Sequence, residues 1–268
     1  MRESGEAAHG HHHGHDVGER LYIHRHSPIH DLPPHLKIIS LLTFLVICVA
    51  TPIQNYWAFI GFAATIITLL ALAKLPVFTI AKRATIEIPF LIFAFLMPFF
   101  SKGERFEVLF FEISRPGAIA ALSIIAKGTL GVLTAILLSG STPAREILRG
   151  FELLKMPSLL VQIMTFMLRY MNVITDEMER MKVARLSRGF QERGIRDWKF
   201  IAGTAGALFV RSYERGERVH LSMLSRGYEG VLPHDEPPHI NKRVWLIAML
   251  YPLVAAIIYI AQLLIGKM

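Results

Sequence analysis

Five apolar segments, each almost free of charge, constrain this chain of 268 residues more than any other feature. A helix that crosses the hydrocarbon core of a bilayer needs about 20 apolar residues, with a range of about 17–25. The segments are continuous and lack the alternation of membrane barrel strands. We therefore expect an all-α integral membrane protein with about five transmembrane helices, the first being the weakest. The segments are residues 36–50, 56–73, 84–100, 117–139 and 244–265.

Positive charge is distributed unevenly around these segments. The net charge is +8, and 17 of the 29 basic residues lie between residues 140 and 243, against 12 acids. Lys and Arg are enriched in cytoplasmic loops, so we expect a multi-pass protein of the cell (inner or plasma) membrane. The N-terminus and residues 140–243 are then cytoplasmic. The predicted organisation is a His-rich polar tail (1–26), four membrane helices (27–139), a cytoplasmic helical region (140–243) and a last membrane helix (244–268).

The region between residues 140 and 243 is predicted to be helical, because its apolar residues recur at helical spacing. Hydroxyl side chains at Ser141 and Thr142, followed by Pro143, are typical of a helix start. On the second helix, Asp176 and Arg180 have the spacing of an i,i+4 ion pair. The expected helices cover residues 144–154, 158–190 and 197–228, and we interpret them as lying under the membrane.

Two short sequences within this region repeat each other. Residues 184–190 read Ala-Arg-Leu-Ser-Arg-Gly-Phe, and residues 222–228 read Ser-Met-Leu-Ser-Arg-Gly-Tyr. One interpretation is that both sequences are ordinary helix C-termini, since Arg favours the negative end of a helix and Gly commonly ends it. Two copies favour docking of the arginine forks onto carboxylates. The candidate residues are Ser187, Arg188, Gly189, Ser225, Arg226 and Gly227, flanked by Leu186, Phe190, Leu224 and Tyr228.

With these motifs the chain resembles the T component of energy-coupling-factor (ECF) transporters, the EcfT family, and most closely its cobalt-type branch, CbiQ. In that family a small residue, an arginine and a glycine end each of two coupling helices and dock into grooves of two ATPases. Serine stands here where the family typically has alanine. Residues 27–37, 167–170, 176–181 and 211–219 also match family patterns, and the resemblance covers residues 27–265.

The resemblance implies a non-catalytic subunit that links two ABC ATPases to a substrate-binding S component. That S component is CbiM-like, with or without a small CbiN-like subunit, for cobalt or nickel; a vitamin is the alternative substrate. The chain has no Gly-x-x-x-x-Gly-Lys-Ser/Thr loop, so ATP and Mg²⁺ are expected on the partners and no cofactor on this chain. Basic residues alternate with acids beside membrane segments, which favours headgroups or ATPases over nucleic acid.

Apart from Lys37 at the start of the first segment, two charged residues interrupt the apolar segments, Glu87 and Lys127. Their depths should differ by roughly 13 Å at 1.5 Å per residue, too far for a direct pair. We expect Lys127 to bond to backbone carbonyls or to contact the S component, on a helix that Gly128 and Gly131 suit to close packing. A self-contained secondary metal transporter needs several intramembrane ligands, and an intramembrane enzyme needs catalytic motifs; the segments offer neither.

The N-terminal tail contains five histidines within seven positions. Imidazoles at this density bind Ni²⁺, Co²⁺ or Zn²⁺ weakly, so metal handling is one interpretation and an unstructured polar tail is the other. No confident metal ligand is assigned. The histidines are His9, His11, His12, His13 and His15.

Overall fold

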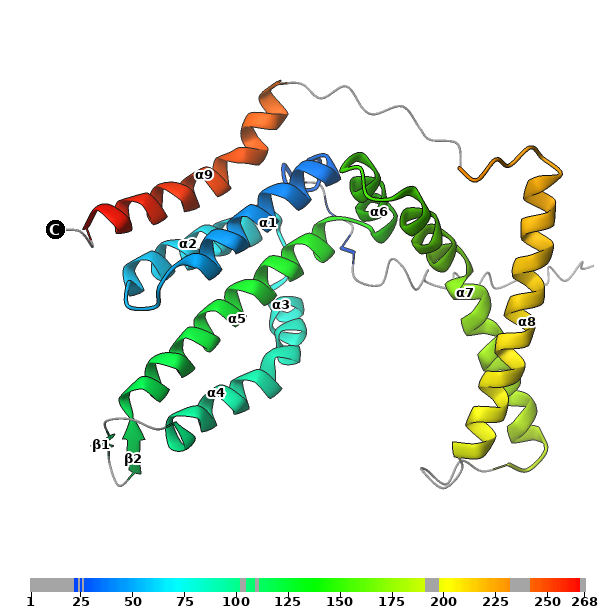
Figure 1. Cartoon of the computed structure of the whole chain (residues 1–268), viewed down its shortest axis with the longest axis horizontal. Coiled ribbons are helices and arrows are strands. Elements are labelled where there is room, and N and C mark those ends of the chain that lie inside the picture. Colours follow the sequence, from blue (N-terminus) through cyan, green and yellow to red (C-terminus); the bar gives the residue numbers. More distant parts are fainter. Residues whose placement is uncertain are drawn as a thin grey trace, which may run out of the picture. The chain divides into compact units, whose positions relative to one another are not determined.

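The computed structural model describes residues 22–23, 25, 27–101, 105–108, 111–190, 198–231 and 242–265. The chain divides into two compact units (Figure 1). The membrane unit comprises the described parts of Leu21–Gln162 and Pro233–Met268, and the helix-pair unit comprises the described parts of Ile163–Leu232.

Helices form nearly all of the described structure, which confirms the all-α class. The membrane unit contains α1 (Pro34–Ala50), α2 (Tyr56–Leu72), α3 (Val77–Ala84), a 3-10 turn (Thr85–Glu87), α4 (Ile88–Phe100), α5 (Arg115–Ser141), α6 (Ala144–Leu153) and α9 (Lys242–Ile265). The helix-pair unit contains α8 (Trp198–Leu224) and most of α7 (Ser158–Ser187). An antiparallel hairpin of β1 (Arg105–Val108) and β2 (Phe111–Ser114) joins α4 to α5, with Arg105 opposite Ser114. The apolar pattern did not predict this hairpin.

Among the described residues, four helical stretches are long and apolar enough to cross a bilayer: Val77–Phe100, Arg115–Ser141, Ser158–Ser187 and Val244–Leu264. Helices α1 and α2, with 17 residues each, are shorter apolar helices. The chain is therefore a multi-pass membrane protein. Helix α7 qualifies by length and composition, so its assignment to the cytoplasmic region stays a prediction.

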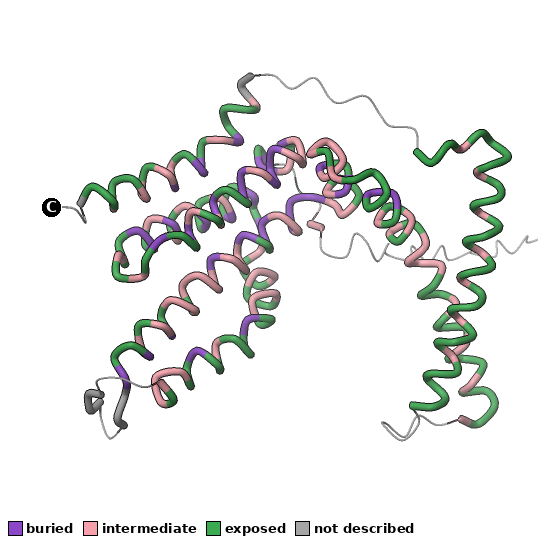
Figure 2. Tube along the Cα trace, in the orientation of Figure 1, coloured by how far each residue is buried: buried purple, intermediate pink, exposed green. Residues whose placement is uncertain are grey.

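The membrane unit has a packed interior and an apolar exterior. Phe44 of α1 meets Phe62 of α2 edge to face, with ring centroids 5.9 Å apart, and both rings are fully buried. Ser40 of α1 shares a hydrogen bond with Tyr251 of α9. Buried positions gather along the helices of this unit (Figure 2). Large apolar side chains such as Trp57 and Phe90 are exposed, as expected for surfaces that face lipid rather than water.

Helix α6 is anchored against the start of α1. The buried ammonium of Lys37 donates hydrogen bonds to the Ser141 carbonyl at 3.2 Å and to Thr142 Oγ1 at 2.9 Å. A Cβ added at Gly150 of α6 would lie 2.7 Å from Ile38 Cδ1 and 3.2 Å from backbone atoms of the first turn of α1. The chain between α5 and α6 is thereby fixed to α1.

The predicted hydroxyl cap of α6 is wrong. Pro143 is the N-cap residue, and no side chain caps the helix. Ser141 still belongs to α5, and the Thr142 hydroxyl is the acceptor for Lys37 instead. A buried ammonium needs hydrogen-bond acceptors more than a helix start needs one side-chain cap.

The helix-pair unit is much more open. Helices α7 and α8 run antiparallel, and contacts between side chains tie them together. They include a hydrogen bond from Arg185 Nη1 to Thr204 Oγ1 at 3.0 Å, an aromatic contact between Phe190 and Phe200 at 4.9 Å, and an ion pair between Glu177 and Arg211. No residue of α8 is buried in the described structure.

Candidate functional site

The two sequence motifs fold into the same turn at the ends of α7 and α8. Gly189 has φ +76° and Gly227 has φ +81°, values in the left-handed region that favours glycine. The amide of the residue after each glycine donates back to a carbonyl five residues earlier, Phe190 to Arg185 at 3.2 Å and Tyr228 to Met223 at 3.0 Å. Each helix therefore ends in a Schellman turn, with glycine at its C′ position.

The serine of each motif belongs to the same turn. The Ser187 hydroxyl donates to the Ala184 carbonyl at 3.0 Å, and the Ser225 hydroxyl donates to the Ser222 carbonyl at 2.9 Å. Both hydroxyls satisfy carbonyls of the last helical turn, which otherwise lack partners. Serine in place of alanine is thus accommodated without disturbing either helix end.

Arg188 and Arg226 stand in equivalent places, one residue before each glycine. Both side chains are exposed, and neither forms an ion pair with another residue in the described ranges. The flanking Leu186 and Leu224 are also exposed, at 51% and 49%. Each turn therefore presents a free guanidinium beside an apolar side chain.

The aromatic residue after each motif packs inside the unit rather than standing free. Phe190 lies against Phe200 in the first turn of α8, whereas Tyr228 meets His220 of its own helix edge to face, with centroids 6.4 Å apart. The first motif is therefore braced by the neighbouring helix. The docking roles assigned to these two rings stay predictions.

The motifs lie at opposite ends of the helix pair (Figure 1). Phe190 places the first motif beside the start of α8, and the second motif follows the end of α8. Helix α8 has 27 residues, which at 1.5 Å per residue is roughly 40 Å. Two arginines about 40 Å apart suit two separate partner sites rather than one.

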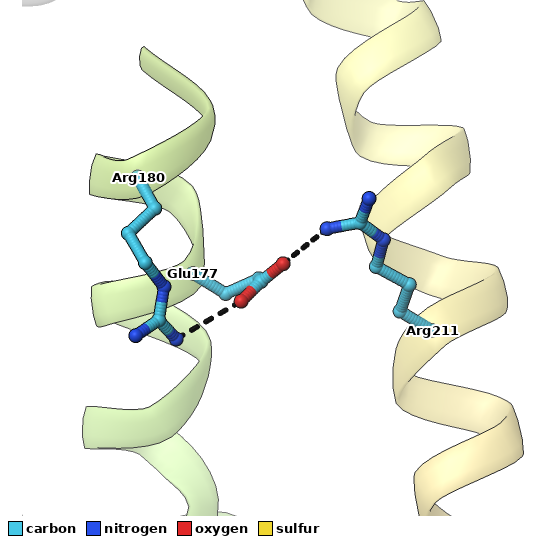
Figure 3. Close-up of polar contacts among 3 residues, drawn as sticks. All are labelled: Glu177, Arg180 and Arg211. Atoms are coloured by element: carbon cyan, nitrogen blue, oxygen red, sulfur yellow. Dashed lines mark hydrogen bonds and ion pairs between the residues drawn. The ribbon is translucent and has the colours of Figure 1, made fainter. Parts of the chain in front are cut away.

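A carboxylate joins the two helices between these ends. One oxygen of Glu177 accepts from Arg180 at 2.9 Å and the other from Arg211 of α8 (Figure 3). The expected pairing of Arg180 with Asp176 is wrong, because Arg180 takes Glu177 one turn away. Sequence reasoning missed Arg211 as a partner, since it lies 34 positions further along.

The two intramembrane charges are accommodated separately, as predicted. Lys127 Nζ donates to the Val49 carbonyl at 2.7 Å, in the last turn of α1, where carbonyls lack helical partners and a cation is favoured. Buried Glu87 accepts from Thr129 Oγ1 at 2.9 Å. A Cβ at Gly128 would lie 2.9 Å from Glu87 Oε1, so this glycine leaves room for the carboxylate, while close helix packing at Gly128 and Gly131 stays a prediction.

The N-terminal stretch that resembles the family pattern lies against the membrane unit. His30 forms hydrogen bonds with the Ser27 hydroxyl at 2.7 Å and the Ile23 carbonyl at 3.2 Å, and the Ile23 amide donates to the Gly140 carbonyl at 3.1 Å. Burial lowers the pKa of His30 below its ordinary value. Together with Lys37, this stretch holds the end of α5.

Comparison with known proteins decides the family. The family model described as "Cobalt transport protein", CbiQ, matches residues 25–240. The chain belongs to the CbiQ family. It is a transmembrane component of an ECF-type transporter, and CbiQ-family proteins are membrane subunits of such transporters.

Relatives of this CbiQ-family chain support the assignment. An uncharacterized protein of Methanocaldococcus jannaschii is 33% identical over 206 residues, covering 74% of this chain and 75% of that protein. The ECF transporter transmembrane protein EcfT of Bacillus subtilis is 26% identical, covering 78% and 83%. A putative fused cobalt transport protein CbiMQ of Methanocorpusculum labreanum is 26% identical, covering 78% of this chain and 37% of the fusion.

No metal site emerges from the part of this CbiQ-family chain that the structure describes. Within it, no group of three or more His, Cys, Asp or Glu side chains is placed to hold a metal ion. The five tail histidines lie outside the described residues. Their metal-handling role therefore stays a prediction.

Proposed function

We propose that this chain couples two cytoplasmic ABC ATPases to a membrane-embedded S component, with the N-terminus and residues 140–243 on the cytoplasmic side. The observation that carries this proposal is the pair of matched Schellman turns. Each exposes one arginine, and the two motifs lie at opposite ends of one helix pair. Two equal partners that dock at separate points need this repetition. ATP and Mg²⁺ bind to the ATPases in this scheme, and the chain itself carries no cofactor.

Docking combines charge with apolar burial. Arg188 and Arg226 each pair with a carboxylate in a groove of one ATPase. An exposed ion pair contributes only about 0–1 kcal/mol, so the exposed Leu186 and Leu224 supply much of the contact by burial. When the ATPases approach each other on binding ATP, the two helix ends move together, and α7 and α8 pass this displacement to the S component.

Cobalt or nickel is the substrate that we propose. The description of the matching family model and the name of the fused CbiMQ relative support this choice, and the fusion supports a CbiM-like S component. A vitamin is the second candidate, because relatives named EcfT match over a similar share of the chain.

Charge reversal at both turns tests the docking role. The double variant Arg188→Glu/Arg226→Glu should insert into membranes normally but lose co-purification with both ATPases. The matched control is Lys182→Glu/Arg218→Glu, which makes the same charge change at exposed positions on the same two helices. If the first variant retains both ATPases and full uptake, the two arginines have no docking role.

Substrate identity needs a separate measurement. Proteoliposomes that contain the chain with its co-purifying partners should accumulate radiolabelled Co²⁺ or Ni²⁺ when ATP is supplied. Deleting residues 1–16 separates the tail from this activity. Uptake of a vitamin without uptake of Co²⁺ or Ni²⁺ would show that the substrate is a vitamin and not a metal ion.

A further inference from the structure

The ion pair between α7 and α8 lies at the surface of the helix pair, but its carboxylate is largely covered. The Glu177 side chain is only 19% exposed, whereas those of Arg180 and Arg211 are 67% and 59% exposed. Its two oxygens take one guanidinium from α7 and one from α8 (Figure 3). We call these three residues the Glu177 crosspiece.

The crosspiece lies at a small groove between the two helices. The groove has a volume of about 210 Å³, and apolar side chains from both helices line it. Partial enclosure by apolar groups disfavours an unpaired carboxylate, so Glu177 stays with its partners. The apolar lining residues include Phe166, Tyr170 and Ile174 of α7 with Leu208 and Val219 of α8.

Two polar ties define how the helices cross. Arg185 bonds to Thr204 near the first motif, and the crosspiece lies eight residues earlier on α7, about 12 Å away. A single contact leaves two helices free to rotate about it, whereas two separate contacts fix the angle between their axes. The Phe190–Phe200 contact also lies near the first motif, so the crosspiece is the contact furthest from it and constrains where the far end of α8 points.

The far end of α8 carries the second motif. Arg226 follows Arg211 by 15 residues, an arm of roughly 22 Å. A rotation of about 10° at Arg211 displaces Arg226 by about 4 Å over that arm.

We propose that Glu177 is a positioning residue that sets the crossing of α7 and α8, and thereby the separation of Arg188 and Arg226. This inference rests on the proposed function. Each arginine can dock without the crosspiece, because neither belongs to it. What the crosspiece supplies is a rigid distance between the two docking points, so that movement of the ATPases displaces the helix pair instead of merely bending it.

The test uses the full complex with its ATPases and S component in proteoliposomes. Glu177→Gln should retain both ATPases, while substrate taken up per ATP hydrolysed falls about two- to thirtyfold, the range for mutations that modulate coupling. The swap Glu177→Arg/Arg211→Glu rebuilds the interhelical pair and should recover most of the ratio. Glu179→Gln removes an exposed carboxylate of the same helix and should leave the ratio unchanged.

A second measurement needs no partner. In a Cys48→Ala background, spin labels at exposed Val183 of α7 and Leu221 of α8 report the crossing directly in the full chain. Glu177→Gln should broaden the label distance distribution, and the swap should narrow it again. An unchanged distribution overturns the positioning role, as does a Glu177→Gln complex with the wild-type uptake ratio. Failure of the wild-type chain to bind any ATPase contradicts the proposed function instead.

Discussion

The two units of this chain are held together by different means. The membrane unit has rings at full burial, a buried lysine and a glycine in contact with another backbone. The helix-pair unit has an α8 without one buried residue in the described structure and depends on a few contacts near its surface. Regions with few buried apolar contacts open at low free energy. The comparison indicates that the membrane unit is rigid and that the helix-pair unit deforms more easily. The following predictions test this difference from the largest expected effect to the smallest.

Lys37→Met should have the largest effect, because it removes the buried ammonium that holds the start of α6. Hydrogen bonds to charged groups contribute about 1.5–3 kcal/mol each, so we expect the free energy of unfolding to fall by about 3 kcal/mol. Thermal unfolding in detergent measures it. Lys82→Met, at an exposed position, is the control. An unchanged melting temperature for Lys37→Met would contradict the rigidity of the membrane unit.

Gly150→Val should come next. The added side chain meets backbone atoms of α1, which cannot move as a flexible side chain can. Overpacking typically costs about 1–3 kcal/mol. Limited proteolysis between α6 and α7 should become faster, and wild-type cleavage rates would show that α6 is not packed as described.

Gly206→Ala in α8 should have the opposite sign. Nothing lies within 4 Å of a Cβ added there, and alanine is favoured over glycine by about 0.8–1 kcal/mol inside a helix. Slower amide exchange in α8 is the expected readout. If Gly206→Ala destabilises α8 instead, the surface of this helix is more closely packed than the structure indicates.

Lowering the pH should have the smallest effect, confined to the N-terminal stretch. Because burial lowers the pKa of His30 from 6.5, the folded stretch favours the neutral ring. Its stabilisation is fully present above pH 6.5 and is lost as the pH falls below that value. The protection factors of the amides of residues 27–33, which are exchange rates corrected for the intrinsic rate at each pH, should therefore fall between pH 7.5 and 5.5. His30→Gln should remove this dependence, and an equal dependence in that variant would assign it to another group.

The sequence alone predicted the features that depend on neighbouring residues along the chain. Apolar runs located the membrane helices, and helical spacing placed α6 at residues 144–154, where the structure has Ala144–Leu153. Glycine after arginine was enough to predict two helix ends, because only the left-handed turn at C′ selects glycine so strongly.

Contacts between distant residues were beyond that reasoning. Lys37 looked like a charge at the edge of a membrane segment, yet its acceptors lie more than 100 positions away. The partner of Glu177 on α8 was hidden for the same reason, since Asp176 and Arg180 offered a plausible local pairing. Such choices are decided by tertiary geometry, which a helical repeat does not encode.

The unequal lengths of the membrane helices have a consequence for the surrounding lipid. Helices α1 and α2, at 17 residues each, measure roughly 25 Å, whereas α5, at 27 residues, measures roughly 40 Å. Such hydrophobic mismatch costs fractions of a kcal/mol per ångström. A short helix locally thins the bilayer, whereas a long helix tilts or locally thickens it. Short-chain lipids should therefore gather beside the α1–α2 hairpin, so that the protein sorts its own lipid annulus by acyl-chain length.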